Sequence, residues 1–227
     1  MTENPKLAGS NIVDCVPQTG ECPMNCAECY GANGGFWHPT DRSLLPSTAE
    51  VGERIVRVNS YNDSNNDHPH VVTTTKRYAR KFFNTSKPSF AFNAPVVFTC
   101  NGREPLFVAC PPNVMMVRVR YTMWDLHVQD ELVEHYLHQH VPVVLTWMRF
   151  GSLDAIPPQE RQHYEHRRHL LHDYWQLTAT SKVLQMERFA GTGVRCCGLP
   201  WSSLCVDCGN CEAAYFTTMR RLDGPDA

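Results

Sequence analysis

Short runs with the character of buried strands alternate with segments of helical periodicity, and this alternation limits the folds open to the chain. The predicted strands are residues 11–16, 71–75, 94–100, 115–124 and 141–148. The predicted helices are residues 49–61, 76–84, 128–140 and 158–177. Strands that alternate with helices favour βαβ units and a largely parallel sheet.

The length of the chain, 227 residues, decides how far such a sheet can close. A βαβ unit needs about 30 residues or more, so a full eight-fold barrel would be cramped. We therefore expect an α/β fold, a partial (βα)5-6 TIM-like barrel of about five or six strands with an irregular cysteine-rich C-terminal tail. The expected organisation is a flexible N-terminus (1–10), the partial barrel (11–190) and a cysteine-rich metal-binding tail (191–227).

Composition excludes several classes of protein. Hydrophobic residues make up 42% and charged residues 19%, which argues against global disorder. The formal net charge of −2 argues against a strongly basic nucleic-acid binder. No apolar run approaches the roughly 20 residues needed to cross a membrane. The first ten residues lack the basic and apolar regions of a secretory signal, so we expect a cytoplasmic protein without a membrane partner.

The eleven cysteines point to metal chemistry. An odd count without a secretory signal argues against a disulfide framework. Eight of the eleven fall in two clusters, residues 22–29 and 196–211, and clustered thiols in a reducing compartment are typical of metal or iron–sulfur ligands. The other three, Cys15, Cys100 and Cys110, are expected to be small buried apolar side chains.

The first cluster, Cys22, Cys26 and Cys29, has the spacing C-x3-C-x2-C and follows the first predicted strand. Three thiolates can hold three corners of a cubane cluster and leave one iron open. An open position distinguishes a catalytic metal site from a closed structural one. The alternative is a structural zinc site, although zinc normally uses C-x2-C pairs.

This loop resembles the signature of the radical S-adenosylmethionine (SAM) enzymes. The resemblance implies that Cys22, Cys26 and Cys29 ligate a [4Fe–4S] cluster whose fourth iron binds SAM. It also implies reductive cleavage of SAM to a 5′-deoxyadenosyl radical, which abstracts hydrogen from an unknown substrate. Tyr30 would then cover the adenine, and an electron donor such as flavodoxin or ferredoxin would be a partner.

A second segment carries the resemblance further. Residues 96–106, VVFTCNGREPL, are similar to the family's strand followed by Gly-Gly-Glu-Pro, with Arg103 at the second glycine position. The resemblance implies that Gly102 and Glu104 contact the amino group of SAM. The alternative is an ordinary strand followed by a Gly/Pro turn.

The second cluster contains Cys197, Cys205, Cys208 and Cys211 in the pattern C-x7-C-x2-C-x2-C. Four thiolates with this spacing can close around one metal site, which would be a second [4Fe–4S] cluster or zinc. Cys196 is an alternative ligand to Cys197. Several radical SAM families carry an auxiliary cluster after the barrel, and this tail is similar in position.

Basic residues suggest what else the chain binds. Arg118 and Arg120 alternate with valines, which would place both arginines on one face of a strand, inside the barrel, where they could hold an anionic substrate. Basic and aromatic residues interleave over 76–83, a pattern that suits single-stranded bases. The substrate could be a small molecule, a peptide or a nucleic acid. The alternative function is a non-catalytic zinc or iron–sulfur binding protein, with nucleic acid as its candidate partner.

Overall fold

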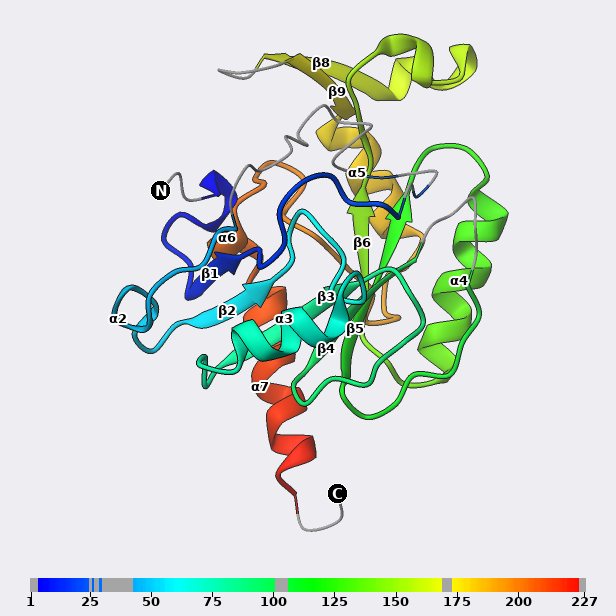
Figure 1. Cartoon of the computed structure of the whole chain (residues 1–227). Coiled ribbons are helices and arrows are strands. Elements are labelled where there is room, and N and C mark those ends of the chain that lie inside the picture. The colour runs from blue at the N-terminus through cyan, green and yellow to red at the C-terminus, as the bar shows by residue number, and fades with distance from the viewer. Residues whose placement is uncertain are drawn as a thin grey trace.

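The computed structural model describes residues 4–24, 26, 29, 43–100, 106–168 and 173–224. Its centre is a sheet of seven parallel strands, curled into a half-barrel (Figure 1). The strand order is β1-β2-β3-β4-β5-β6-β10. Their bounds are β1 Ile12–Cys15, β2 Ile55–Val58, β3 Lys81–Thr85, β4 Val96–Cys100, β5 Val114–Tyr121, β6 Val143–Trp147 and β10 Arg195–Cys196. The α/β partial barrel predicted from the sequence is confirmed.

The described helices are unequal in length. The α-helices are α2 Thr48–Val51, α3 His68–Thr75, α4 Leu126–His138, α5 Ala179–Glu187, α6 Cys205–Cys208 and α7 Asn210–Leu222. The 3-10 helices are η1 Pro5–Leu7, η2 Leu153–Ala155 and η3 Pro158–His163. In Figure 1, α4 and α7 lie on either side of β5, and both pack against that strand.

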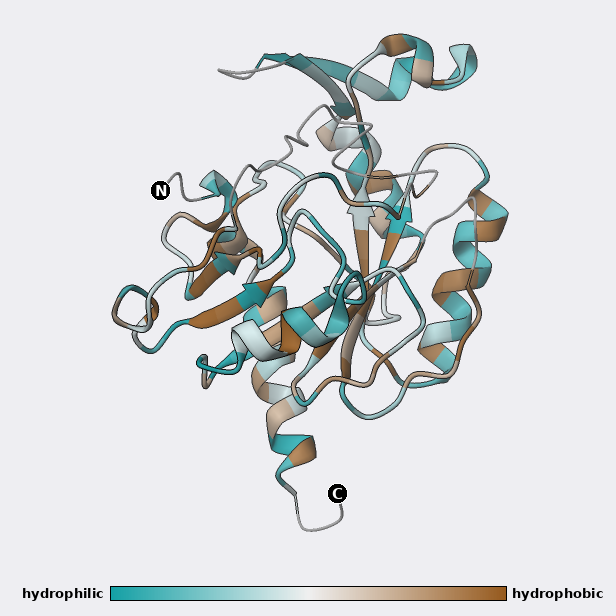
Figure 2. Cartoon of the chain, in the orientation of Figure 1, coloured by the Kyte–Doolittle hydropathy of each residue, from teal (hydrophilic) through white to brown (hydrophobic). Residues whose placement is uncertain are grey.

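Alternation along the strands divides the core into two faces. The outer face packs against α4 and α3: Val119 and Leu132 belong to one buried cluster, and Val58 and Val71 belong to another. The inner face packs against α7, where Tyr215 joins the strand residue Val97. Figure 2 shows hydrophobic residues along these strands, which fits a sheet covered on both sides. Leu7, within the segment expected to be a flexible end, is buried in the inner-face cluster.

Five predicted elements are confirmed, and four are wrong. The segments 11–16, 94–100, 115–124, 128–140 and 141–148 contain β1, β4, β5, α4 and β6. The predicted helix 49–61 is wrong because α2 stops at Gly52, whose φ of 56° suits glycine, and β2 follows. The predicted helix 76–84 is wrong because its aromatic residues enter β3, which is buried along its whole length.

The predicted strand 71–75 is wrong because this β-branched run forms the second half of α3. Val71 and Thr75 lie one turn apart and are both buried, while the Thr75 hydroxyl donates to the Val71 carbonyl at 2.8 Å. Burial of this face against the sheet outweighs the strand propensity of valine and threonine.

The predicted helix 158–177 is also wrong. Residues 158–163 form η3. The strand β9 (Asp173–Leu177) pairs antiparallel with β8 (Tyr164–Arg168) on one side and with β7 (Arg149–Phe150) on the other. Tyr164 and Leu177 face each other in the register and are buried, while the far ends of β8 and β9 are exposed or partly exposed. This small sheet projects beyond the end of β6 (Figure 1) and is largely hydrophilic (Figure 2).

The tail was expected to be irregular, but residues 205–222 are mostly helical. Cys211, Tyr215 and Thr218 are buried at helical spacing on α7, so one stripe of this helix docks on the sheet. The other side of α7 is exposed or partly exposed, as the alternation of burial along the helix shows. The C-terminal segment is therefore part of the half-barrel rather than a loose appendage.

Candidate metal centre

The first cysteine cluster lies on a loop whose base is fixed at the carboxyl end of β1. Val16 and Leu44 exchange two backbone hydrogen bonds of 2.8 Å, so the two ends of the loop are held side by side. Cys22, Cys26 and Cys29 follow within this loop and are all partly buried. The carboxyl ends of parallel strands are where α/β folds hold their ligands.

The three thiols lie within electrostatic reach of one another. Burial raises the pKa of Cys22, and the neighbouring groups that raise it further are Asp63, Cys26 and Cys29. Burial likewise raises the pKa of Cys26, and Arg120 on β5 lowers it. The Cys29 amide donates to the Cys26 carbonyl at 3.0 Å. Cys22 and Cys26 thus lie within electrostatic range of Asp63, which follows β2, and Cys26 also lies within range of Arg120 near the end of β5.

Charged residues line the inner face below this loop. Arg57 Nε donates to Asp14 Oδ1 at 2.7 Å, and both side chains are almost fully buried. Burial lowers the pKa of Arg57, but the Asp14 carboxylate more than offsets this and holds the pKa above its ordinary value. Arg118 donates to Asn84 Oδ1 at 3.2 Å and to the sulfur of Cys211 at 3.1 Å.

Asp63 organises the loop that follows β2. Its carboxylate accepts hydrogen bonds from the Thr85 hydroxyl at 2.8 Å and from the amides of Asn65 and Ser86 at 2.8 and 2.6 Å. These bonds tie the ends of β2 and β3 together. The Asp63 carboxylate, which lies within electrostatic range of Cys22 and Cys26, is therefore held in place by the fold.

Three buried acceptors near this edge have no hydrogen-bond partner among the described residues: Asp14 Oδ2, Gln18 Oε1 and Asn59 Oδ1. Buried acceptors are normally satisfied, so each is a place where a ligand or water would donate. Gln18 also lines a hollow of about 500 Å³ between the loops after β1 and β2. The edge beside the cysteine loop therefore offers acceptors to a ligand that carries hydrogen-bond donors.

The second cysteine cluster faces the same inner side of the sheet. Burial raises the pKa of Cys205 to about 11; Arg57 lowers it, whereas Cys197, Cys211 and Cys208 raise it. Cys205 thus lies within electrostatic range of the other three tail thiols that were predicted as ligands. As the side chains stand, however, no three His, Cys, Asp or Glu residues in the described part of the chain are arranged to hold a metal ion.

Sequence reasoning found some of these residues and missed others. Arg118 and Arg120 lie on the inner face, as their alternation predicts, but Arg118 contacts Asn84 and Cys211. Asp14 and Arg57 were missed, although a single charged residue inside each of two apolar strand runs, NIVDCV and IVRV, is a usable signal. Tyr30, Gly102 and Glu104, for which the resemblance implies contacts with SAM, lie outside the described residues.

Of the three remaining cysteines, Cys15 and Cys100 are buried as expected, whereas Cys110 is only partly buried. Burial raises the pKa of Cys15 and of Cys100 to about 12, and that of Cys110 to about 11. Thiols with such values stay protonated at neutral pH and act as small apolar side chains.

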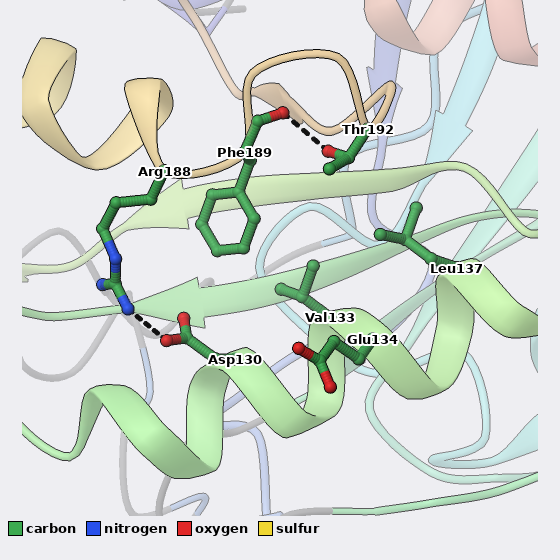
Figure 3. A pocket seen from close by; sticks show the side chains of 7 residues that line it. All are labelled: Asp130, Val133, Glu134, Leu137, Arg188, Phe189 and Thr192. Atoms are coloured by element: carbon green, nitrogen blue, oxygen red, sulfur yellow. Dashed lines mark hydrogen bonds and ion pairs between the residues drawn. The ribbon is translucent and has the colours of Figure 1, made fainter.

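A separate hollow of about 190 Å³ lies on the outer side between α4 and the end of α5 (Figure 3). Phe189, Val133 and Leu137 form its apolar wall, and an ion pair between Arg188 and Asp130 crosses one end. Arg188 also donates to Tyr121 Oη at 2.8 Å, so the ion pair belongs to a network that fastens α4 to the sheet. This hollow contains none of the predicted site residues.

Comparison with protein-family models, curated proteins and solved structures found no match for this chain. Among the helices that the structure describes, none has the length and apolar character needed to cross a membrane. What the site does must therefore be inferred from its own residues.

Proposed function

We propose that this protein is a radical SAM enzyme in which Cys22, Cys26 and Cys29 hold a [4Fe–4S] cluster. The observation that carries the proposal is that three partly buried thiols at C-x3-C-x2-C spacing follow the carboxyl end of β1 in a parallel half-barrel. Three thiolates leave one iron of a cubane without a protein ligand, which is the position that SAM requires. When bound, the cluster and SAM supply one-electron cleavage of SAM and removal of a hydrogen atom from substrate.

The surrounding residues fit this cofactor pair by their chemistry. The guanidinium of Arg120 lies against Cys26 and would offset the negative charge of a thiolate-bound cluster. The unpartnered oxygens of Asp14, Gln18 and Asn59 would accept hydrogen bonds from amino or hydroxyl groups. SAM carries both kinds of donor. The three sulfurs are not gathered tightly in the structure, so cluster assembly would draw the loop inward.

The proposal keeps the further roles that the resemblance implies. Gly102 and Glu104 would contact the SAM amino group, and Tyr30 would cover its adenine. A reduced flavodoxin or ferredoxin would deliver the electron.

The test is formation of 5′-deoxyadenosine by the anaerobically reconstituted protein with SAM and dithionite. The wild-type chain should release it, and Cys26→Ser should release none, because two thiolates do not retain the cluster. Cys110→Ser is the matched control, since this partly buried thiol lies outside both clusters and should leave the yield unchanged. Equal yields from Cys26→Ser and the wild type, or a wild-type chain that takes up zinc and no iron, would contradict the proposal.

A further inference from the structure

The tail thiols reach the inner face of the sheet from three consecutive segments. Cys197 follows β10, Cys205 and Cys208 lie on α6, and Cys211 lies in the first turn of α7. A tight turn connects Cys197 to the segment that leads into α6. Gly198 has a φ of 81°, and a Cβ at this position would lie 2.6 Å from the Ser202 carbonyl oxygen, so only glycine fits. The turn sends the chain straight from Cys197 back to α6.

Alternation along β10 settles which of the two adjacent cysteines faces this centre. Cys196 pairs in register with Leu145, is buried in the outer-face cluster, and donates its thiol proton to the Gly198 carbonyl at 3.0 Å. The Cys197 amide continues the strand ladder by donating to the Leu145 carbonyl at 2.8 Å. Successive side chains point to opposite faces, so Cys197 belongs to the inner face with Arg118.

Charged side chains of the strands lie on the inner face beside the tail thiols. The charged side chains that the described strands bury or partly bury on this face are Arg57, Arg118, Arg120 and Asp14. Asp14 is engaged by Arg57. Arg118 directs one nitrogen at the Cys211 sulfur, 3.1 Å away. The Cys211 thiolate would pair with the charge of this guanidinium group.

A four-thiolate metal centre would place negative charge beside two of these cations. Four thiolates around Zn²⁺, or around a [4Fe–4S]²⁺ core, carry a net charge of about −2 in either case. Cys211 raises the pKa of both Arg57 and Arg118, and Cys205 also raises the pKa of Arg57. The cations therefore lie beside the thiols that would carry this charge.

We propose that Cys197, Cys205, Cys208 and Cys211 form a four-thiolate metal centre on the inner face of the half-barrel, with Arg57 and Arg118 balancing its charge. Each thiol releases its proton to solvent as its sulfur bonds the metal. Because the sulfurs are not yet gathered, metal binding would tighten the turn, α6 and the start of α7 into one unit. Cys196 takes no part as a ligand.

This inference does not rest on the proposed SAM chemistry, and its test removes the first site. The full chain carrying Cys22→Ser, Cys26→Ser and Cys29→Ser is prepared with zinc or, anaerobically, with iron and sulfide. We expect about one zinc or about four irons per chain. The metal that the protein retains after exposure to both zinc and iron shows whether the tail centre is a zinc site or an iron–sulfur cluster. In this background Cys197→Ala should lose the metal, whereas Cys196→Ala should keep it.

Cys197 is exposed, so its replacement leaves packing intact, and circular dichroism checks that the variants are folded. Loss of metal from Cys196→Ala with retention by Cys197→Ala would overturn the ligand assignment. A triple variant that binds neither zinc nor iron would overturn the centre itself.

The role of Arg118 is tested by competition of the triple variant with a zinc chelator. Arg118→Met should weaken zinc binding by about ten- to a hundred-fold, as is typical for residues that hydrogen-bond a metal ligand. Arg118→Lys should recover part of the affinity because it keeps the charge. Arg220→Met is the matched control, since Arg220 is exposed on α7. Equal affinities for Arg118→Met and Arg220→Met would overturn the charge-balancing role.

Discussion

Single charged residues inside apolar strands are what give the inner face its chemistry. Asp14 and Arg57 stand at matching positions of β1 and β2 and form a buried ion pair of 2.7 Å. Arg118 and Arg120 stand two residues apart on β5, and they contact the tail thiol Cys211 and the loop thiol Cys26. One strand therefore carries a cation toward each cysteine cluster.

Lys182 on α5 is the buried residue with the clearest energetic consequence. Burial lowers its pKa from 10.5 to about 8, with Arg149 acting in the same direction and Glu165 against it. At pH 7 the amine is charged in both the folded and the unfolded chain, so the cost of burying the charge is fully present. Above about pH 8 the folded chain releases the proton first, and this cost disappears by about pH 10.5.

We therefore predict that Lys182→Met stabilises the protein at pH 7 and that the gain shrinks as the pH rises to 10. The difference between the two pKa values corresponds to a gain of at most about 3 kcal/mol in the free energy of unfolding. Urea unfolding at both pH values measures it, with Lys87→Met, at an exposed position, as the control. A gain that is equal at pH 7 and pH 10 would show that the burial cost is not the cause.

At the scale of elements, α7 covers the inner face of the sheet. Asn210 at its start donates to the Cys196 carbonyl at 2.7 Å, and Arg221 near its end donates to the Val114 carbonyl at 3.1 Å. Between these anchors Tyr215 is 3% exposed and packs in the inner-face cluster. The helix is thus fixed to β10 at one end and to β5 at the other.

Tyr215→Ala should lower the free energy of unfolding by about 3 kcal/mol, because it removes a large buried ring and leaves a cavity. Arg220→Ala, at an exposed position of the same helix, should change it by less than about 0.5 kcal/mol. Chemical unfolding followed by circular dichroism compares the two. If both variants unfold at the same urea concentration as the wild type, α7 does not stabilise the sheet.

Elements were predictable from sequence where local preference and tertiary burial agree. In β5 the alternation of valine and arginine matches an inner face that is polar near the carboxyl edge and an outer face that meets α4. In α3 the two disagree, because valine and threonine favour strands but a buried i, i+4 stripe decides the outcome. The β8–β9 pair was missed because histidines recur every three residues from His163 to His172, which suggests a helix. Only Tyr164 of β8 and Leu177 of β9 are buried, so the sequence offers little hydrophobic alternation that would reveal these strands.

At the scale of the whole molecule, the half-barrel joins the two ends of the chain on one face. The first cysteine cluster follows β1, the first strand, and the second follows β10, the last. The sequence shows both clusters, but only the strand order and the docking of α7 place them on the same side of the sheet. The pairings of Arg57 with Asp14 and of Arg118 with Cys211, which join residues far apart in the chain, depend on the same topology.

The central claim is that the loop thiols hold a cluster with one iron open to SAM. The most direct measurement is the electron paramagnetic resonance spectrum of the reduced cluster, recorded with and without SAM in the Cys197→Ala variant, where the tail centre is absent. We predict about four irons per chain and a spectrum whose g values shift when SAM is added, because SAM binds the open iron. An identical spectrum with saturating SAM, from a chain that holds the full cluster, would contradict the account.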